Sequence, residues 1–194
     1  MDTNYFSKSF FETQDFLSDD DRKKLLELTT LKRYPANTII LKSGEFTNDV
    51  GVVMEGLIRV YGLNDKSVHF VTDGQVFGSM DTLVLKKPSR YNYETLEDTV
   101  MFVLNYEELE ASTQKYPNIG LLLLNYWKQT AMNIFKNLNS FIKYSPEERY
   151  EHLIKKQPHL VLRVKSKYLA SYLGIHPVSL SRLKSRFLKN SDDE

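Results

Sequence analysis

The chain of 194 residues is long enough for one large domain or two small ones, and its 41% hydrophobic and 26% charged residues are ordinary for a globular protein. It contains no cysteine, which excludes disulfides, thiol catalysis and cysteine-ligated zinc or iron–sulfur clusters. The N-terminal residues do not have the pattern of a secretory signal, and the longest apolar run, residues 119–124, is too short to span a bilayer. We therefore expect a cytoplasmic protein without membrane contact.

The net charge of +1 conceals an asymmetry along the chain. Residues 1–142 hold 15 Lys and Arg against 19 Asp and Glu, whereas residues 143–190 hold 11 Lys and Arg against 3 Asp and Glu. A basic module on a mildly acidic body is typical of a nucleic-acid binder. Composition alone leaves open the alternative of a solvated basic face that binds nothing.

The first half of the sequence predicts one helix followed by a β-rich region. Residues 18–31 combine a capping residue with an apolar face, which favours a helix. From residue 38 to about 104, short β-rich runs alternate with glycine or Asp/Asn turn signals, as in an antiparallel barrel or sandwich. The interval 79–98 is less regular and predicts one short helix and a loop through residues 87–89. The β-rich runs are TIILKS, GVVMEG, LIRVYGL, VHFVTDG and TVMFVL.

The pattern becomes helical at Tyr106, and residues 113–143 contain its most regular apolar repeat. Along one stripe the residues step by three and four, as in a coiled-coil seam, and only Lys128 is polar. We interpret this seam as a contact with a second copy of the chain and a second apolar stripe as a contact with the β-rich domain. The alternative is one helix inside a single core. The seam contacts are Leu121, Leu124, Ala131, Phe135 and Leu138, and the second stripe is Leu123, Trp127, Ile134 and Phe141.

Residues 144–194 predict a mostly helical domain. The segment SPEE at 145–148 supplies a cap, a proline for the first turn and two acids for the positive helix end, so a helix begins there and ends before Pro158. An extended piece at 160–164 and two helices, at 166–173 and 177–188, are expected to follow.

The segment SKYLASYLGIHPVSLSRLKSRFL, residues 166–188, has the pattern of a helix-turn-helix. Ser166 is expected to cap the first helix, Ala170 lets the second helix cross closely, and Gly174 supplies the left-handed turn residue. Leu180, Leu183 and Phe187 or Leu188 are expected to bury the second helix. The alternative is a plain helical hairpin with a basic surface.

In a helix-turn-helix, the beginning of the second helix enters the major groove. Arg182 is expected to read guanine, because a guanidinium can pair with both acceptors on that base. Basic and hydroxyl side chains toward the flanks are expected to meet phosphates and to add salt-dependent affinity. The expected base contacts are His176, Val178, Ser179 and Arg182, and the expected phosphate contacts are Lys165, Lys167, Lys184, Ser185 and Arg186.

These features together resemble the Crp/Fnr family of bacterial regulators. The resemblance rests on RYPANTIILKSGE, VVMEGLIRVY and TDGQVFGS in the first half and on SPEERYEHLIKKQPHL and KYLASYLGIHPVSLSRL in the second. It implies an α+β chain: an antiparallel β-roll (a jelly roll of the cyclic nucleotide-binding type) in 1–112, a dimerisation helix in 113–143 and a winged-type helix-turn-helix domain in 144–194. The wing is expected to be shortened and formed by residues 157–165.

The resemblance also implies an effector pocket at Gly78, Ser79, Ser89 and Arg90. Relatives that bind cyclic AMP carry a glutamate after the glycine, which holds the ribose, and an arginine that neutralises the cyclic phosphate. Here Ser79 replaces the glutamate, and Pro88 stands where the arginine is needed. An unpaired phosphate in a half-buried pocket is strongly disfavoured, so we predict that cyclic AMP is not the effector.

The sequence thus predicts a homodimeric, sequence-specific DNA-binding transcription regulator and not an enzyme. Its four histidines show no pair at a metal-ligand spacing, and no P-loop, dinucleotide fingerprint or nucleophile elbow is present, so no catalytic residue, metal or cofactor is expected. Double-stranded DNA and a second copy are the expected partners, to which the resemblance adds RNA polymerase and an unidentified small-molecule effector. The alternative is a small-molecule-binding or protein-interaction module with a structural helical tail.

Overall fold

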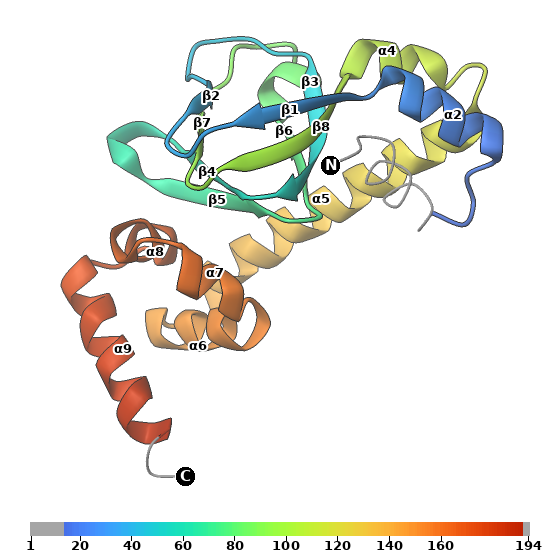
Figure 1. Cartoon of the computed structure of the whole chain (residues 1–194). Coiled ribbons are helices and arrows are strands. Elements are labelled where there is room, and N and C mark those ends of the chain that lie inside the picture. Colours follow the sequence, from blue (N-terminus) through green and yellow to red (C-terminus); the bar gives the residue numbers. More distant parts are fainter. Residues whose placement is uncertain (1–13, 192–194) are drawn as a thin grey trace. The chain divides into compact units, whose positions relative to one another are not determined.

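The computed structural model describes residues 14–191, with side chains up to residue 187 (Figure 1). The chain divides into two units. One contains the described residues up to 60 together with 70–130, and the other contains 61–69 and the described residues from 131 onward. The division falls within one continuous helix, α5, Pro117–Lys143.

The β-rich region forms two four-stranded sheets, with strand orders β1-β8-β3-β6 and β2-β7-β4-β5. Strand β8 runs antiparallel to both β1 and β3, as β6 does to β3 and β7 does to β2, which confirms the predicted antiparallel β-roll. The strands are β1 (Thr30–Tyr34), β2 (Ile39–Leu41), β3 (Asp49–Glu55), β4 (Leu57–Tyr61), β5 (Ser67–Thr72), β6 (Val76–Gly78), β7 (Asn92–Thr95) and β8 (Thr99–Asn105). A short 3-10 turn, η1 (Leu63–Asp65), connects β4 to β5.

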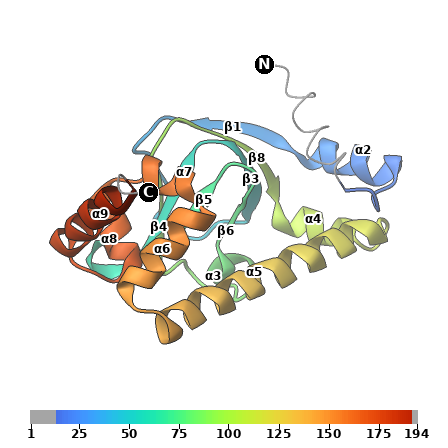
Figure 2. The ribbon, with the colours of Figure 1, turned by 90° about the horizontal axis from the view of Figure 1, so that it is seen from below.

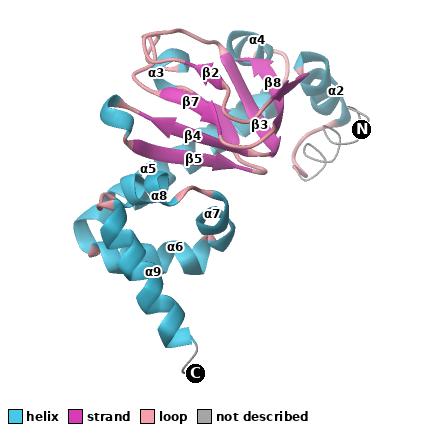
Figure 3. Cartoon of the chain, turned by 60° about the vertical axis from the view of Figure 1, so that its left-hand side comes forward, coloured by secondary structure: helices cyan, strands magenta, loops and turns pink. Residues whose placement is uncertain are grey.

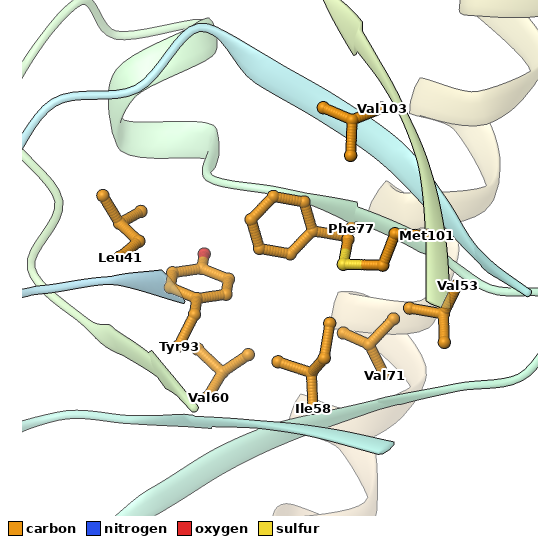
Figure 4. Close-up of a cluster of buried hydrophobic side chains, with 9 residues drawn as sticks. All are labelled: Leu41, Val53, Ile58, Val60, Val71, Phe77, Tyr93, Met101 and Val103. Carbon is orange, nitrogen blue, oxygen red and sulfur yellow. The ribbon is translucent and has the colours of Figure 1, made fainter. Parts of the chain in front are cut away.

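The core of the roll lies between these two sheets (Figure 4). Both sheets contribute buried apolar side chains to it, and the Phe77 and Tyr93 rings meet edge to face with centroids 5.4 Å apart. Burial raises the pKa of the Tyr93 phenol to about 12, so this hydroxyl stays neutral in the core. The cluster comprises Leu41, Val53, Ile58, Val60, Val71, Phe77, Tyr93, Met101 and Val103.

Helices of the first unit pack around a second apolar cluster, whose buried members include Leu25, Leu104, Leu109 and Ile119. These helices are α2 (Asp19–Leu28), α3 (Met80–Leu83), α4 (Tyr106–Ser112) and the first part of α5. The helix predicted for residues 18–31 is shorter than expected: it ends at Leu28, and residues 30 and 31 belong to β1. The reason is non-local, because these two residues pair with Val103 and Phe102 of β8.

The two apolar stripes of α5 have different surroundings. Leu123 and Trp127, from the second stripe, pack against the helical cluster of the first unit, in line with the prediction. Ile134 and Phe141, farther along that stripe, are 54% and 45% exposed. The seam residues all remain exposed within the described single chain, with Phe135 at 60%.

Residues 144–191 form four helices and contain no strand (Figure 3). They are α6 (Pro146–Lys156), α7 (Pro158–Arg163), α8 (Ser166–Leu173) and α9 (Pro177–Ser191). The predicted start of α6 is confirmed by a capping box, in which Ser145 and Glu148 each bond the backbone of the other.

The extended piece predicted at 160–164 is wrong, and so is the shortened wing expected from residues 157–165. These residues form α7, with Pro158 in its first turn. The missing N–H of a proline costs no helical hydrogen bond at that position. Leu160 is buried in this helix, whereas Leu162 is 85% exposed, so the apolar run LVL belongs to a helix with one buried face rather than to a strand.

Candidate nucleic-acid interface and effector pocket

The turn between α8 and α9 has the geometry of a helix-turn-helix. Gly174 adopts the left-handed conformation, φ 69° and ψ 31°, and its N–H donates to the carbonyls of Ala170 and Ser171. The N–H of Ile175 donates to the Ala170 carbonyl at 3.0 Å, which completes the closure of the helix end. A side chain at Gly174 would be strained, so the glycine is required by the turn itself.

His176 forms the beginning of α9. Its carbonyl accepts from the N–H groups of Ser179 and Leu180, and its ring Nδ1 lies 3.3 Å from the backbone nitrogen of Val178. The ring therefore caps the helix, while the exposed part of the imidazole remains available to a ligand.

The two faces of α9 differ in burial. Leu180 and Leu183 are buried at 0% and 6% exposure against the buried Leu169, Ala170 and Leu173 of α8. Phe187 meets Tyr150 of α6 edge to face at 5.5 Å, and the Leu188 side chain lies outside the described residues. This packing fixes the rotation of α9 about its axis and so decides which residues face outward.

All four predicted base contacts are exposed. Val178 is 52% exposed, and His176, Ser179 and Arg182 are exposed as well. Ser179 and Arg182 lie three residues apart and share one face of the helix. No hydrogen bond or ion pair joins Arg182 to another described residue. The structure thus gathers these side chains on one outer face at the beginning of α9.

Among the predicted phosphate contacts, some side chains already have a polar partner within the described part of the chain and others do not. Lys165 and Lys167 are exposed, and Lys167 Nζ lies 4.5 Å from the Tyr168 ring centroid. Lys184 Nζ donates to Ser166 Oγ at 3.0 Å, and Arg186 pairs with Glu147 at 3.0 Å.

Two further hydroxyl groups of this region have local roles. The Ser185 hydroxyl donates to the Ser181 carbonyl within α9. Ser166 does not cap α8 as predicted: Lys165 occupies the cap position without a side-chain hydrogen bond, and the Ser166 hydroxyl accepts from Lys184 instead.

In the roll, the predicted effector residues lie at the two ends of the segment from Gly78 to Arg90. Ser79 and Ser89 are buried, and Ser89 exchanges backbone hydrogen bonds with Gly44 and Glu45. A Cβ atom on Gly78 would come within 3.1 Å of Leu83, so α3 packs closely against this strand end. The short helix α3 follows directly on β6 within this segment (Figure 2).

Arg90 is held by a carboxylate of its own chain. Its Nε and NH2 groups donate to Asp81 at 3.0 and 2.7 Å, and its backbone N–H donates to the same carboxylate at 3.0 Å. The hydrogen bonds from Arg90 hold the pKa of the Asp81 carboxyl below its usual value of 3.8, so Asp81 stays ionised near neutral pH. Asp81 is buried and Arg90 is largely exposed.

Asp81 is a residue that the sequence reasoning missed. It stands nine positions before Arg90 in the same short segment, and that spacing by itself does not predict a contact. For Glu147, the partner of Arg186, the sequence predicts only a place at the positive end of its helix. Both omissions have one cause, because each acid finds its basic partner through the fold and not through a motif.

Across residues 14–191, no helix is long and apolar enough to cross a membrane. The same residues contain no group of three or more His, Asp or Glu side chains placed to hold a metal ion.

Comparison with known proteins supports the fold assignment. The family of cyclic nucleotide-binding domains matches residues 31–116. FixK2 from Bradyrhizobium japonicum has a similar structure, with a TM-score of 0.72, 20% identity and coverage of 84% of this chain and 86% of that one. A transcriptional regulator of the Crp/Fnr family from Eubacterium rectale gives a TM-score of 0.70 at 14% identity, with coverage of 94% and 88%.

A curated relative is similar over the roll alone. It is the Pycsar effector protein XpPycTIR of Xanthomonas perforans, 23% identical over 116 residues, which are 60% of this chain and 36% of that protein. The chain thus spans about a third of the length of that relative. The roll thus has the fold of cyclic nucleotide-binding domains, and the chain has the fold of the Crp/Fnr regulators, as the sequence predicted.

Proposed function

We propose that this protein is a Crp/Fnr-type transcription regulator that binds palindromic double-stranded DNA as a homodimer in the cytoplasm, and that it acts by binding rather than by catalysis. The observation that carries the proposal is the two-sided character of α9. Its apolar face is buried on α8, and the opposite face presents Val178, Ser179 and Arg182, which pairs with no other described residue. A helix that only stabilised a tail would not need an open arginine at this position.

Arg182 is proposed to read a guanine, with Ser179 and Val178 reading its neighbours. Ser179 and Arg182 share a face, so both reach the groove when the first turns of α9 enter it. A guanidinium can pair with O6 and N7 of guanine, whereas Val178 offers only an apolar contact such as one to a thymine methyl group. His176, at the exposed start of the helix, completes this group.

Lys165, Lys167, Lys184, Ser185 and Arg186 are proposed to contact phosphates. The pairing of Arg186 with Glu147 does not argue against this role, because both side chains are well exposed, at 60% and 42%. An exposed ion pair of this kind is worth about 0–1 kcal/mol, so a phosphate can compete for the arginine. Lys184 and Ser166 likewise form an exposed hydrogen bond that a phosphate can replace.

Homodimerisation is proposed through the seam of α5. Leu121, Leu124, Ala131, Phe135 and Leu138 follow one stripe and are all exposed in the described chain. A coiled-coil contact with a second copy would bury this stripe and place two copies of α9 about 34 Å apart, one turn of DNA. RNA polymerase is the further partner that such a regulator would meet on DNA.

Cyclic AMP is proposed not to be the effector. The only charged group supplied by the predicted pocket residues is Arg90, and Asp81 already neutralises it through the side-chain and backbone hydrogen bonds described above. A cyclic phosphate would have to displace a buried carboxylate of the same charge, and Ser79 offers no carboxylate for the ribose. Any small-molecule effector would therefore use other contacts.

The experiment that tests the proposal is selection of bound sequences from random duplexes, followed by gel-shift titration of the winning sequence. The expected product is an inverted repeat with half-site centres about 34 Å apart. The other candidate, a ligand-binding or protein-interaction module with a structural tail, predicts no enrichment of any sequence. Enrichment that survives in Arg182→Ala with the same base preferences would contradict the assigned reading face.

A further inference from the structure

Arg149, in the first turns of α6, contacts three separate segments of the second unit. Its NH1 group donates to the carbonyl of Tyr144 at 2.8 Å, just beyond the end of α5. Its NH2 group donates to the carbonyl of Leu173 at 2.7 Å, at the end of α8. The guanidinium also lies over the ring of Phe141, 4.5 Å from its centroid, on the last turns of α5. One side chain thus joins the end of the long helix to the first helix of the helix-turn-helix.

A guanidinium suits this position for physical reasons. The ends of α5 and α8 present carbonyl groups that lack partners within their helices, and both helix ends are electronegative. The planar fork of arginine can donate to two such carbonyls at once while its face rests on an aromatic ring. No carboxylate pairs with Arg149 among the described residues, and burial lowers the pKa of its guanidinium.

The arrangement has a cost that argues against an incidental contact. The Nε group of Arg149 is buried and has no hydrogen-bond partner among the described residues. A buried donor without a partner is destabilising, so the remaining contacts must be favourable enough to hold the side chain there. A solvent-exposed conformer of the side chain would avoid this cost, but it would also lose the hydrogen bonds to the Tyr144 and Leu173 carbonyls.

The turn glycine belongs to the same contact region. A Cβ atom placed on Gly174 would lie 3.4 Å from Phe141 and 3.8 Å from the NH2 group of Arg149. The turn that positions α9 therefore packs against the last turns of α5 and against Arg149. We name Phe141, Arg149, Leu173 and Gly174 the joint.

We propose that Arg149 is a positioning residue that fixes the α8–α9 pair relative to the last turns of α5. Resting on the proposed function, this has a consequence for DNA: in a dimer held by α5, the joint sets the separation and angle of the two copies of α9. It thereby selects the spacing between half-sites, while the base-reading residues select their sequence. No base or phosphate contact of Arg149 is involved.

The first test measures the joint without DNA. Because the chain has no cysteine, Lys136→Cys on α5 and Ser181→Cys on α9 provide two unique spin-label sites, both exposed. The labelled chain is diluted into an excess of unlabelled protein, so that only distances within one chain are measured. We expect a narrow distribution in the wild type and a broader, shifted one in Arg149→Met.

The matched control is Lys156→Met, which removes one exposed positive charge from the same helix. We expect this variant to keep the wild-type distribution. Arg149→Lys retains the charge but not the fork, so it should also broaden the distribution even if the methionine variant fails to fold. A wild-type distribution in both Arg149 variants would overturn the proposal.

The second test titrates palindromes with different spacers and an isolated half-site. Arg149→Met should bind the half-site like Lys156→Met, lose roughly tenfold in affinity for the best palindrome, and show a weaker preference among spacers. An unchanged spacer preference would overturn the role in DNA spacing. Absence of wild-type binding to any duplex would refute the proposed function alone, because the label distances are obtained without DNA.

Discussion

Arg90 in the roll and Arg182 on α9 show how differently one residue type can be used in the two regions of this chain. Arg90 pairs with the buried carboxylate of Asp81 through its side chain and its backbone. Arg182 pairs with no described residue and extends from a helix whose other face is buried. Asp81 therefore fixes the position of the Arg90 guanidinium, whereas the charge of Arg182 is left for another molecule.

This difference teaches that a positive charge near a predicted pocket identifies a site only when the fold leaves it without a partner. The roll keeps the architecture of a cyclic nucleotide-binding domain, and in it the charge of Arg90 is already paired with an acid of the same chain. The helix-turn-helix keeps its turn geometry and leaves exposed the face of α9 that we propose to read DNA.

The largest expected effect comes from preventing dimerisation, because a monomer would present only one exposed face of α9 to the DNA. The double variant Phe135→Glu/Leu138→Glu places charges on two exposed seam residues that a dimer would bury, so we expect a monomer. Affinity for the palindrome should fall roughly 100-fold or more, because the two half-sites are no longer bound together. Light scattering and gel-shift titration measure both effects.

Lys136→Glu is the control for that variant, since it introduces a glutamate, here by reversing a charge, on the same helix outside the seam. It should remain dimeric. A monomeric wild-type protein at micromolar concentration, or a dimeric double variant, would show that the seam does not hold the subunits together.

The next largest effect concerns the reading arginine. Arg182→Ala should reduce discrimination at one base pair per half-site by about 1–3 kcal/mol. Lys184→Ala should instead weaken binding to all sequences alike and flatten the salt dependence by about one unit. Titrations on single-base variants of the selected operator, repeated at several salt concentrations, separate the two roles. Uniform loss of affinity in both variants would show that Arg182 does not read a base.

A smaller effect is expected from removing the ion pair between Asp81 and Arg90 in the roll. Asp81→Asn removes the charge partner of Arg90 and should lower the melting temperature at neutral pH by roughly 2–4 °C. Because Arg90 lowers the pKa of Asp81 in the folded protein, the stabilisation is present above the ordinary value of 3.8 and is lost as pH falls through the lower folded value. The difference between wild type and variant should therefore narrow in acid.

Thermal melts at a series of pH values measure this difference. Glu107→Gln, which affects the exposed pair with Lys86 in the same unit, is a suitable control. Equal melting temperatures of wild type and Asp81→Asn at neutral pH would mean that the pair does not stabilise the roll.

The last prediction is that cyclic nucleotides have no measurable effect on the protein. Cyclic AMP and cyclic GMP should give no binding heat with the wild-type protein and no shift of its melting temperature, because Arg90 is already neutralised. Calorimetry with the dimer at millimolar nucleotide is the measurement. Tight binding of either nucleotide would contradict the prediction that Asp81 keeps Arg90 from binding a cyclic phosphate.

Much of the fold was predictable because its signals are local. The β-rich runs, the capping box at Ser145 and Glu148, and the turn at Gly174 each follow from neighbouring residues in the chain. The strands β1, β6 and β7 were not predicted. They are three to five residues long and exist because distant strands pair with them, as β8 does with β1.

The candidate site shows the same division. The outward face of α9 could be predicted from the spacing of Leu180 and Leu183, and the structure places the four expected base contacts on the exposed face. The partners of Arg90, Arg149, Lys184 and Arg186 could not be predicted. Each pair joins residues that different elements bring together, and no motif encodes it.

By itself the sequence determined the order of the elements, the basic second domain and the two faces of its last helix. These follow from periodicity, caps and charge, which act over a few residues. Only the tertiary structure decided that residues 158–163 are helical and that Arg90 pairs with Asp81. It also decided that Arg149 joins the ends of α5 and α8. The physical reason is that burial and hydrogen-bond partners depend on which distant groups the fold brings within about 3 Å of one another.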